Sequence, residues 1–127
     1  MRRLGISEQG RKRVLIVDDD LDSAELLQEL LQGAGHEVAI AHDGTRAIAL
    51  ATALHPEVVL LDIHLGSSLD GYDVCQHLGA ALDRPKRIIA MTGPAALDDL
   101  RFREAGFDAH IAKPILDTNR ILRLLES

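Results

Sequence analysis

The strongest constraint on the fold is a regular alternation of short apolar runs with longer segments of helical periodicity. The predicted strands lie at 13–17, 37–41, 58–61, 87–91 and 109–112, and the predicted helices at 22–34, 45–54, 71–82, 95–105 and 117–125. Runs that are apolar at every position suit strands buried on both faces, and short loops between alternating strands and helices favour a parallel sheet. We therefore predict an α/β fold, doubly wound, with five parallel strands and helices on both faces of the sheet.

Length and charge distribution indicate one domain preceded by a short tail. The chain has 127 residues, of which 46% are hydrophobic and 27% charged, a composition typical of globular domains. Residues 1–13 carry five basic side chains and one acidic side chain, whereas the rest of the chain carries nine basic and nineteen acidic ones. We predict a flexible basic N-terminal tail at residues 1–12 and a folded domain at residues 13–127.

Composition also excludes several classes of protein. An acidic body argues against nucleic-acid binding as the main task, because phosphate contacts need clustered arginine and lysine. No apolar run is long enough to span a bilayer and no secretory signal follows the basic start, so we expect no membrane insertion. The single cysteine, Cys75, excludes an internal disulfide and fits the reducing cytoplasm; we expect it to be a small core residue.

Polar side chains at the ends of the predicted strands carry the functional signal. Asp18 and Asp19 follow the first strand, Asp62 the third, Thr92 the fourth and Lys113 the fifth. Ligands of open parallel sheets bind at the carboxyl ends of the strands, where the strand order reverses. Three carboxylates in one crevice repel one another, and a hard divalent cation such as Mg²⁺ relieves that repulsion. A cation beside a hydroxyl and an ammonium group is suited to binding a phosphoryl group.

Five short blocks stand in order at the ends of the predicted elements: Val14-Leu15-Ile16-Val17-Asp18-Asp19-Asp20, Leu60-Leu61-Asp62, Asp70-Gly71-Tyr72, Met91-Thr92-Gly93 and Lys113-Pro114. These blocks resemble the signature blocks of response-regulator receiver domains. The resemblance covers residues 13–127 and implies a flavodoxin-like sheet with strand order 2-1-3-4-5. Met91-Thr92-Gly93 and Gly106-Phe107-Asp108-Ala109-His110 most resemble the corresponding segments of receivers attached to hybrid sensor kinases.

The resemblance implies a phosphoacceptor and a metal site. Asp62 matches the aspartate that takes a phosphoryl group from a histidine kinase or a histidine phosphotransfer protein. Asp19 matches the direct Mg²⁺ ligand, Asp18 the residue that holds the metal through water, and the main-chain carbonyl of His64 the third protein oxygen. Such a domain is not an enzyme, apart from phosphorylating itself from small donors and dephosphorylating itself.

The same resemblance implies the groups that bind the phosphoryl oxygens. Thr92 matches the hydroxyl residue that turns toward them, Lys113 the cation, and the amides of Ile63 and Gly93 complete the set. The bond between Lys113 and Pro114 is expected to be cis. Phosphorylation would then switch the surface of the fourth helix, fifth strand and fifth helix, which a downstream protein, a parent chain or a second copy in a homodimer would read.

Two departures from the family pattern bear on this interpretation. The loop after Asp62 carries Gly66-Ser67-Ser68-Leu69 in place of a shorter loop with a proline, and we expect it to be more mobile. His110 stands where receivers usually carry the Tyr or Phe whose rotation reports phosphorylation. His110 is therefore a switch candidate, although a partly exposed strand residue is the simpler interpretation.

Alternative functions remain open at this level. The chain could be a receiver-like scaffold that binds partners without phosphorylation, or a phosphatase of the haloacid-dehalogenase type with Asp18 as nucleophile and Asp20 as acid and base. A calcium loop with Glu29 as its last ligand is excluded because Ser23 replaces the required glycine. Charged residues of the fourth predicted helix, including Arg101, form a candidate contact face.

Overall fold

The computed structural model describes residues 10–66, 69–93, 99–115 and 117–126. The predicted tail at 1–12 lies largely outside the described residues, as do Ser67 and Ser68 of the loop expected to be mobile and the first residues of the helix predicted at 95–105. Arg11 and Lys12 are described and contact the second strand. The Arg11 guanidinium pairs with the Glu37 carboxylate, and the Glu37 N–H donates to the Lys12 carbonyl at 2.9 Å.

The described residues form a five-stranded parallel sheet in the order β2-β1-β3-β4-β5, which confirms the predicted fold class and strand order. The strands are β1 (Arg13–Val17), β2 (Glu37–Ala41), β3 (Val58–Asp62), β4 (Arg87–Thr92) and β5 (Ala109–Ala112). The helices are α1 (Leu21–Gly33), α2 (Gly44–Leu54), α3 (Gly71–Ala80), α4 (Asp99–Ala105) and α5 (Thr118–Glu126). No helix among the described residues combines the length and apolar character needed to cross a bilayer.

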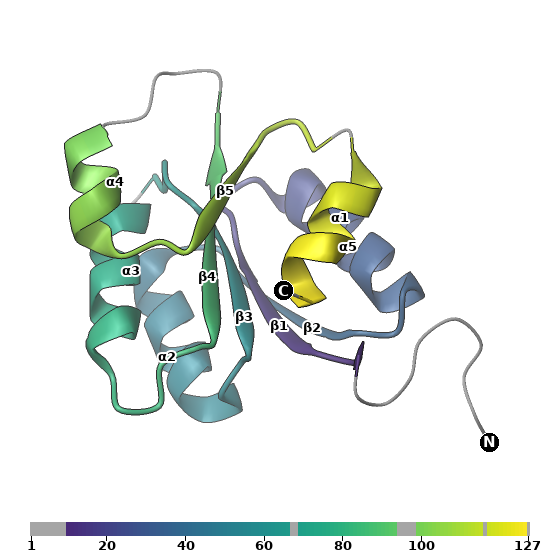
Figure 1. Cartoon of the computed structure of the whole chain (residues 1–127), viewed down its shortest axis with the longest axis horizontal. Helices are drawn as coiled ribbons and strands as arrows, with labels where there is room; N and C mark the ends of the chain where they lie inside the picture. Colours follow the sequence, from purple (N-terminus) through teal and green to yellow (C-terminus); the bar gives the residue numbers. More distant parts are fainter. Residues whose placement is uncertain (1–9, 67–68, 94–98, 116, 127) are drawn as a thin grey trace.

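Helices cover both faces of the sheet (Figure 1), with α2, α3 and α4 on one face and α1 and α5 on the other. Successive side chains of β1 point to opposite faces, so Leu15 packs with the first group of helices and Ile16 with the second. Each face has its own apolar cluster, which explains why the strands are apolar at every position. Cys75 of α3 is fully buried in the first cluster, as expected, and its Sγ donates to the Ala105 carbonyl of α4 at 3.2 Å. Burial raises the pKa of the Cys75 thiol to about 12.

Side-chain caps determine where the first three helices begin. The Asp20 carboxylate accepts hydrogen bonds from the N–H groups of Asp22 and Ser23, which starts α1 at Leu21. Asp43 caps α2 by accepting from the Arg46 N–H at 2.7 Å. Asp70 and Asp73 bond to each other's backbone N–H in a capping box at the start of α3. These caps lie at the carboxyl ends of β1, β2 and β3, so the loops that hold them run along one edge of the sheet.

The register of the strands brings the predicted site together. Val17 of β1 is paired with Leu61 of β3, so Asp18 and Asp62 follow two residues that are already neighbours. Thr92 of β4 is paired with Ala112 of β5, and the backbone N–H of Lys113 continues this ladder by donating to the Thr92 carbonyl at 2.7 Å. The central position of β1 and β3 in the sheet places the three carboxylates where the strand order reverses.

Candidate functional site

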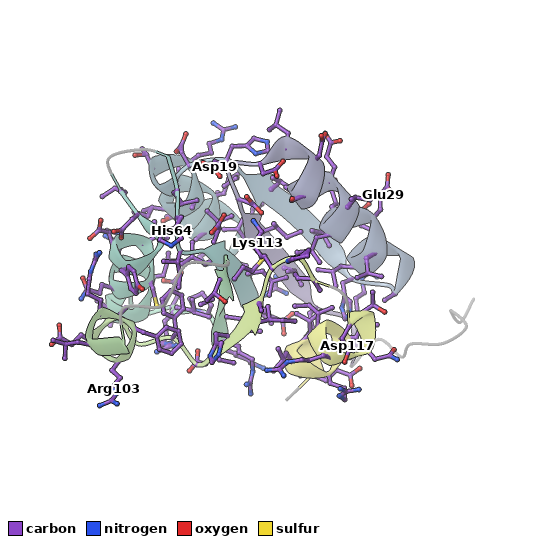
Figure 2. All side chains as sticks on the ribbon, turned by 90° about the horizontal axis from the view of Figure 1, so that it is seen from above. Asp19, Glu29, His64, Arg103, Lys113 and Asp117 are labelled. Atoms are coloured by element: carbon purple, nitrogen blue, oxygen red, sulfur yellow. The ribbon has the colours of Figure 1, made fainter. Side chains whose placement is uncertain are left out.

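The carboxylates of Asp18, Asp19 and Asp62 form one cluster at the carboxyl edge of the sheet. One oxygen from each lies within 4.8 Å of the others. Asp18 is 2% exposed and Asp62 is 6% exposed, whereas Asp19 is open to solvent. Figure 2 looks down on this edge and shows Lys113 near the middle of the molecule and Asp19 above it in the view, with Glu29 well away along α1. The position of Glu29 agrees with the exclusion of a calcium loop.

The Lys113 ammonium group lies between the two buried carboxylates. Its Nζ donates to Asp18 Oδ2 at 2.8 Å and to Asp62 Oδ2 at 3.2 Å. Burial alone would lower the pKa of Lys113, but the hydrogen bond to Asp18 and the charges of Asp62 and Asp18 outweigh it and raise that pKa above its ordinary value. Lys113 is therefore positively charged and is held in the crevice by two acids that share it.

The pKa of Asp62 reflects a different balance of burial and nearby charges. Burial raises the pKa of its carboxyl group above the ordinary value, and the nearby charge of Asp18 adds to this. The charge of Lys113 and the hydrogen bond that the His64 N–H donates to Asp62 Oδ1 at 3.0 Å act in the opposite direction without cancelling it. Two carboxylates sharing one ammonium group leave net negative charge in a buried place, and this charge favours binding of a cation.

Asp18 is held by contacts on every side. Its N–H donates to the Ala41 carbonyl at 3.0 Å, and its Oδ1 accepts from the Asp20 N–H at 2.9 Å. With Oδ2 bonded to Lys113, both carboxylate oxygens of Asp18 have partners within the protein. The side chain is therefore fixed in the crevice before any ligand arrives.

Asp19 makes a contact that the sequence does not indicate. Its Oδ2 accepts a hydrogen bond from the backbone N–H of Gly66 at 3.1 Å. This bond joins the end of β1 to the loop between β3 and α3, which follows Asp62 and carries His64 near its start. His64 itself is exposed, and Figure 2 shows it at the same edge of the sheet. The main-chain oxygens near Asp62 thus lie on a loop that is tied to the exposed acid.

The predicted phosphoryl-binding groups make hydrogen bonds within the protein. Thr92 is 7% exposed, and its hydroxyl donates a hydrogen bond to the Ile111 carbonyl at 3.4 Å. The Ile63 N–H donates to the Met91 carbonyl at 3.2 Å, as the parallel pairing of β3 and β4 requires. Either donor would have to break its bond to the carbonyl oxygen before it could donate to a phosphoryl oxygen. The amide of His64, which already points at Asp62 Oδ1, is a donor that the sequence analysis missed.

Gly93, Pro114 and His110 complete the predicted set. A Cβ atom added at Gly93 would meet no atom within 4 Å, so the position also has room for alanine. The Lys113–Pro114 peptide bond is cis. The His110 side chain is exposed on β5, and its ring meets that of Phe102 of α4 edge to face at a centroid distance of 5.5 Å. Phe102 in turn stacks on Phe107 at 5.1 Å.

Arg101 of α4 contacts the start of α3 rather than extending only into solvent. Its guanidinium group lies 3.0 Å from the Asp70 carboxylate and stacks over the Tyr72 ring at 4.3 Å from the centroid. Asp70 and Tyr72 flank Gly71, whose N–H donates to the Ile63 carbonyl at 2.9 Å. The predicted contact face on α4 is therefore linked through α3 to the residue that follows Asp62.

A groove of about 320 Å³ opens beside the cluster. It runs between α1 and the segment that joins β5 to α5, and its lining is mainly apolar. Residues that line it include Leu26, Leu27, Leu30, Ile115, Asp18 and Lys113. Leu26 is 69% exposed, so apolar surface continues from the groove onto the outside of α1. A large ligand could thus contact apolar surface next to the charged site.

The chemical groups of the cluster and of Lys113 determine which ligands the site suits. All its acidic groups offer oxygen atoms, which are the ligands preferred by hard divalent cations such as Mg²⁺. The net negative charge around Asp62 fits such a cation. The ammonium group of Lys113, 3.2 Å from Asp62 Oδ2, supplies positive charge beside Asp62 and suits an anionic group bound there. The residues present therefore fit a site for a divalent cation beside a phosphoryl group.

Comparisons with known proteins agree with this arrangement. A family model described as the response regulator receiver domain matches residues 14–126. The DNA-binding response regulator MtrA of Mycolicibacterium paratuberculosis is 36% identical over 115 residues, which are 90% of this chain and 50% of that protein. The chain thus spans about half the length of this relative.

Solved structures show the same fold. The signal receiver domain of a signal transduction histidine kinase from Syntrophus aciditrophicus has a TM-score of 0.79 and 28% identity, covering 90% of this chain and 89% of that one. The signal receiver domain of a modulated diguanylate cyclase from Desulfovibrio desulfuricans G20 has a TM-score of 0.79 and 28% identity, covering 91% and 92% of the two chains.

Proposed function

The chain belongs to the response regulator receiver domain family, and from that premise we propose that it is a phosphoacceptor signalling domain with Asp62 as the acceptor. The observation that carries the proposal is the position of the Asp62 carboxylate. It lies buried at the end of a central strand, next to two other acids and 3.2 Å from the Lys113 ammonium group. A buried carboxylate with a charged lysine beside it is suited to take up and hold a dianionic group.

The proposed reaction transfers a phosphoryl group from a phosphorylated histidine to an oxygen of Asp62. The new O–P bond forms as the P–N bond to the donor imidazole breaks, and the imidazole keeps the electron pair and takes up a proton. Lys113 attracts the incoming oxygens, and the His64 N–H holds Oδ1 of Asp62, which leaves Oδ2 as the oxygen nearer to Lys113. The side chain is thus oriented before the donor arrives.

Mg²⁺ is the proposed cofactor. Asp19, Asp62 and the His64 carbonyl would hold it directly, and Asp18 would do so through water. A bound Mg²⁺ would neutralise negative charge shared by the carboxylates and the phosphoryl oxygens. Asp18 is already bonded to Lys113 and to the Asp20 N–H, so its fixed carboxylate supports the site without having to move.

Phosphorylation is proposed to switch the surface formed by α4, β5 and α5. The Thr92 hydroxyl would exchange its bond with the Ile111 carbonyl of β5 for one with a phosphoryl oxygen. That exchange changes how β4 and β5 are joined next to the edge that carries His110. A ligand shifts such a balance only through contacts that differ between the two states, and Thr92 supplies one.

The proposed phosphodonor is a histidine kinase or a histidine phosphotransfer protein. A protein donor needs a surface on which to dock beside Asp62, and the apolar groove between α1 and the segment after β5 lies next to Lys113. The readout would be a downstream protein, a second copy in a homodimer, or the rest of a longer chain. A cytoplasmic location, expected from the single cysteine, forms part of this proposal.

The phosphatase alternative fits the geometry less well. It needs Asp18 as the nucleophile and, beside it, Asp20 as an acid and base whose carboxylate is free to exchange a proton with the substrate. The Asp20 carboxylate caps α1, accepting from the Ser23 hydroxyl at 3.0 Å and from two backbone N–H groups. We propose that the domain is not an enzyme beyond its own phosphorylation and dephosphorylation.

Intact-mass measurement with acetyl phosphate and Mg²⁺ tests the proposal. The wild-type chain should gain the mass of one phosphoryl group, and Asp62→Asn should gain none. Asp18→Asn separates the alternatives, because hydrolysis of a phosphate monoester that is lost in Asp18→Asn and kept in Asp62→Asn would support the phosphatase. A wild-type chain that takes up no phosphoryl group from acetyl phosphate or from a phosphorylated histidine protein would support the scaffold.

A further inference from the structure

His42, the first residue after β2, contacts the backbone of the acidic cluster. Its ring Nδ1 lies 3.1 Å from the carbonyl oxygen of Asp18. A carbonyl oxygen can only accept a hydrogen bond, so Nδ1 must carry the hydrogen and donate it. The imidazole is exposed, and none of the functional roles assigned above involves it.

This bond fixes the peptide group between two members of the cluster. The Asp18 N–H donates to the carbonyl of Ala41, and the Asp18 carbonyl accepts from the side chain of the next residue, His42. Both main-chain polar groups of Asp18 are thus bonded to consecutive residues at the end of β2. Because the Asp18 carbonyl and the Asp19 N–H belong to one planar peptide group, its orientation sets the direction in which Asp19 leaves the strand.

Asp19 needs such support more than its neighbour does. The Asp18 side chain is buried and is bonded through both oxygens, whereas the Asp19 side chain is exposed and is bonded to the Gly66 N–H of a loop. Gly66 is itself exposed and has no side chain to anchor it. A second constraint acting on Asp19 through the backbone would therefore lower the entropy that the acid loses when it binds a cation.

We propose that His42 is a positioning residue that aims Asp19 at the divalent cation through the Asp18 carbonyl. The inference rests on the proposed Mg²⁺ site and adds a residue to it. His42 does not touch the cation; its contribution is the hydrogen bond that holds the peptide plane. Partners of this kind, one step removed from the ligands, typically influence metal affinity.

Three substitutions separate the N–H donor from the bulk of the ring. His42→Ala removes both, His42→Phe keeps a ring without the donor, and His42→Asn places an amide N–H where Nδ1 stood. Exposed His77 on α3 provides the control His77→Ala. Isothermal titration calorimetry with MgCl₂ gives the affinity of each protein, and thermal unfolding without Mg²⁺ shows whether the fold is intact.

We expect His42→Ala and His42→Phe to bind Mg²⁺ about three- to tenfold more weakly than the wild type, the range for one hydrogen bond. His42→Asn and His77→Ala should stay close to the wild type, and all variants should unfold at similar temperatures. If His42→Ala binds Mg²⁺ as tightly as the wild type does, the inference is overturned while the metal site stays in place. The same holds if His42→Asn binds Mg²⁺ as weakly as His42→Ala does. A wild type that binds no Mg²⁺ would instead refute the proposed metal site, and this inference with it.

Discussion

Asp19 and Gly66 are joined by a hydrogen bond of 3.1 Å from the Gly66 N–H to Oδ2 of Asp19, although 47 positions separate them in the chain. A Cβ atom on Gly66 would lie 3.0 Å from the same oxygen, so the backbone approaches the acid closely. The contact ties the exposed member of the acidic cluster to the loop that follows Asp62. A cation that binds Asp19 therefore acts on this loop as well.

The first prediction concerns the affinity of the cluster for Mg²⁺. Asp19→Ala should weaken Mg²⁺ binding by at least about tenfold, because removing a direct ligand should cost no less than removing a supporting partner. Asp22→Ala is the matched control, since it removes one negative charge from the first turn of α1 but no atom of the cluster. Calorimetric titration gives both affinities. Equal loss in the two variants would mean that only the overall charge matters, and an unchanged affinity in Asp19→Ala would move the site elsewhere.

The second prediction concerns the cost of ionising Asp62 without a cation. Its pKa is raised chiefly by burial, so the folded protein binds this proton more tightly than the unfolded chain does. The associated stability is complete below the ordinary value of 3.8 and is lost as the pH rises through the pKa of the folded state. At neutral pH and without Mg²⁺, Asp62→Asn should therefore raise the melting temperature by about 3–5 °C, on the order of 1 kcal/mol for a domain of this size.

Two further measurements check that explanation. The stabilisation by Asp62→Asn should shrink as the pH is lowered toward 3.8, and saturating Mg²⁺ should stabilise the wild type more than the variant. Asp22→Asn, at an exposed position in the first turn of α1, should instead be neutral or slightly destabilising, because it removes a favourable charge near a helix N-terminus. A variant less stable than the wild type at neutral pH would show that the attraction of Lys113 outweighs burial.

The third prediction concerns the close contact between α3 and the strand that ends in Asp62. A Cβ atom on Gly71 would lie 2.4 Å from the Asp62 carbonyl oxygen and 2.5 Å from the Ile63 Cα, and both are backbone atoms. Gly71→Ala should therefore cost about 1–3 kcal/mol in the free energy of unfolding, measured with urea. Gly79→Ala near the end of the same helix is the control. A Cβ atom on Gly79 would have an arginine nitrogen at 4.0 Å as its nearest neighbour, so Gly79→Ala should raise the free energy of unfolding by up to about 1 kcal/mol. A harmless Gly71→Ala would mean that α3 can move away from Ile63.

Much of the fold could be predicted because both faces of the sheet are buried. The apolar runs at 13–17, 37–41 and 109–112 coincide with β1, β2 and β5, so the predicted bounds of these strands agree with the structure. The ladders of β3 and β4 each continue one residue further, onto Asp62 and Thr92. In the sequence, Asp62 and Thr92 mark the end of an apolar run because they are polar, although their backbones still pair with the neighbouring strand. The predicted strands stopped one residue early at these two functional positions.

The parts of the site that sequence did not reveal depend on backbone groups and on contacts between distant segments. The N–H groups of His64 and Gly66 bond to Asp62 and Asp19, but a backbone N–H is common to every residue except proline and leaves no mark in a sequence. Arg101 has the pattern of a solvated helix residue, yet it pairs with Asp70 of α3. Only the packing of α4 against α3 creates that pair.

The fourth prediction concerns His36, the residue just before β2, which is 6% exposed. Its Nδ1 accepts a hydrogen bond from the Lys12 N–H at 3.0 Å, so the ring is neutral in this arrangement. Burial lowers the pKa of His36, and the charge of Lys12 lowers it further. The charges of Glu126 of α5 and of Glu57 raise this pKa, but they do not cancel the effect of burial. The unfolded chain therefore binds this proton more readily than the folded protein. The stability linked to neutral His36 is complete above pH 6.5 and is lost as the pH falls toward the lowered pKa.

His36→Asn tests this link, because its side-chain oxygen can still accept from the Lys12 N–H but does not titrate in this range. Denaturant unfolding between about pH 5 and pH 7 should show the wild type losing stability toward acid more steeply than His36→Asn. The matched variant His77→Asn, at an exposed position on α3, should keep the wild-type slope. If His36→Asn and the wild type lose stability in parallel, the acid sensitivity arises elsewhere. If His77→Asn flattens the slope as much as His36→Asn does, burial of the ring is not its cause.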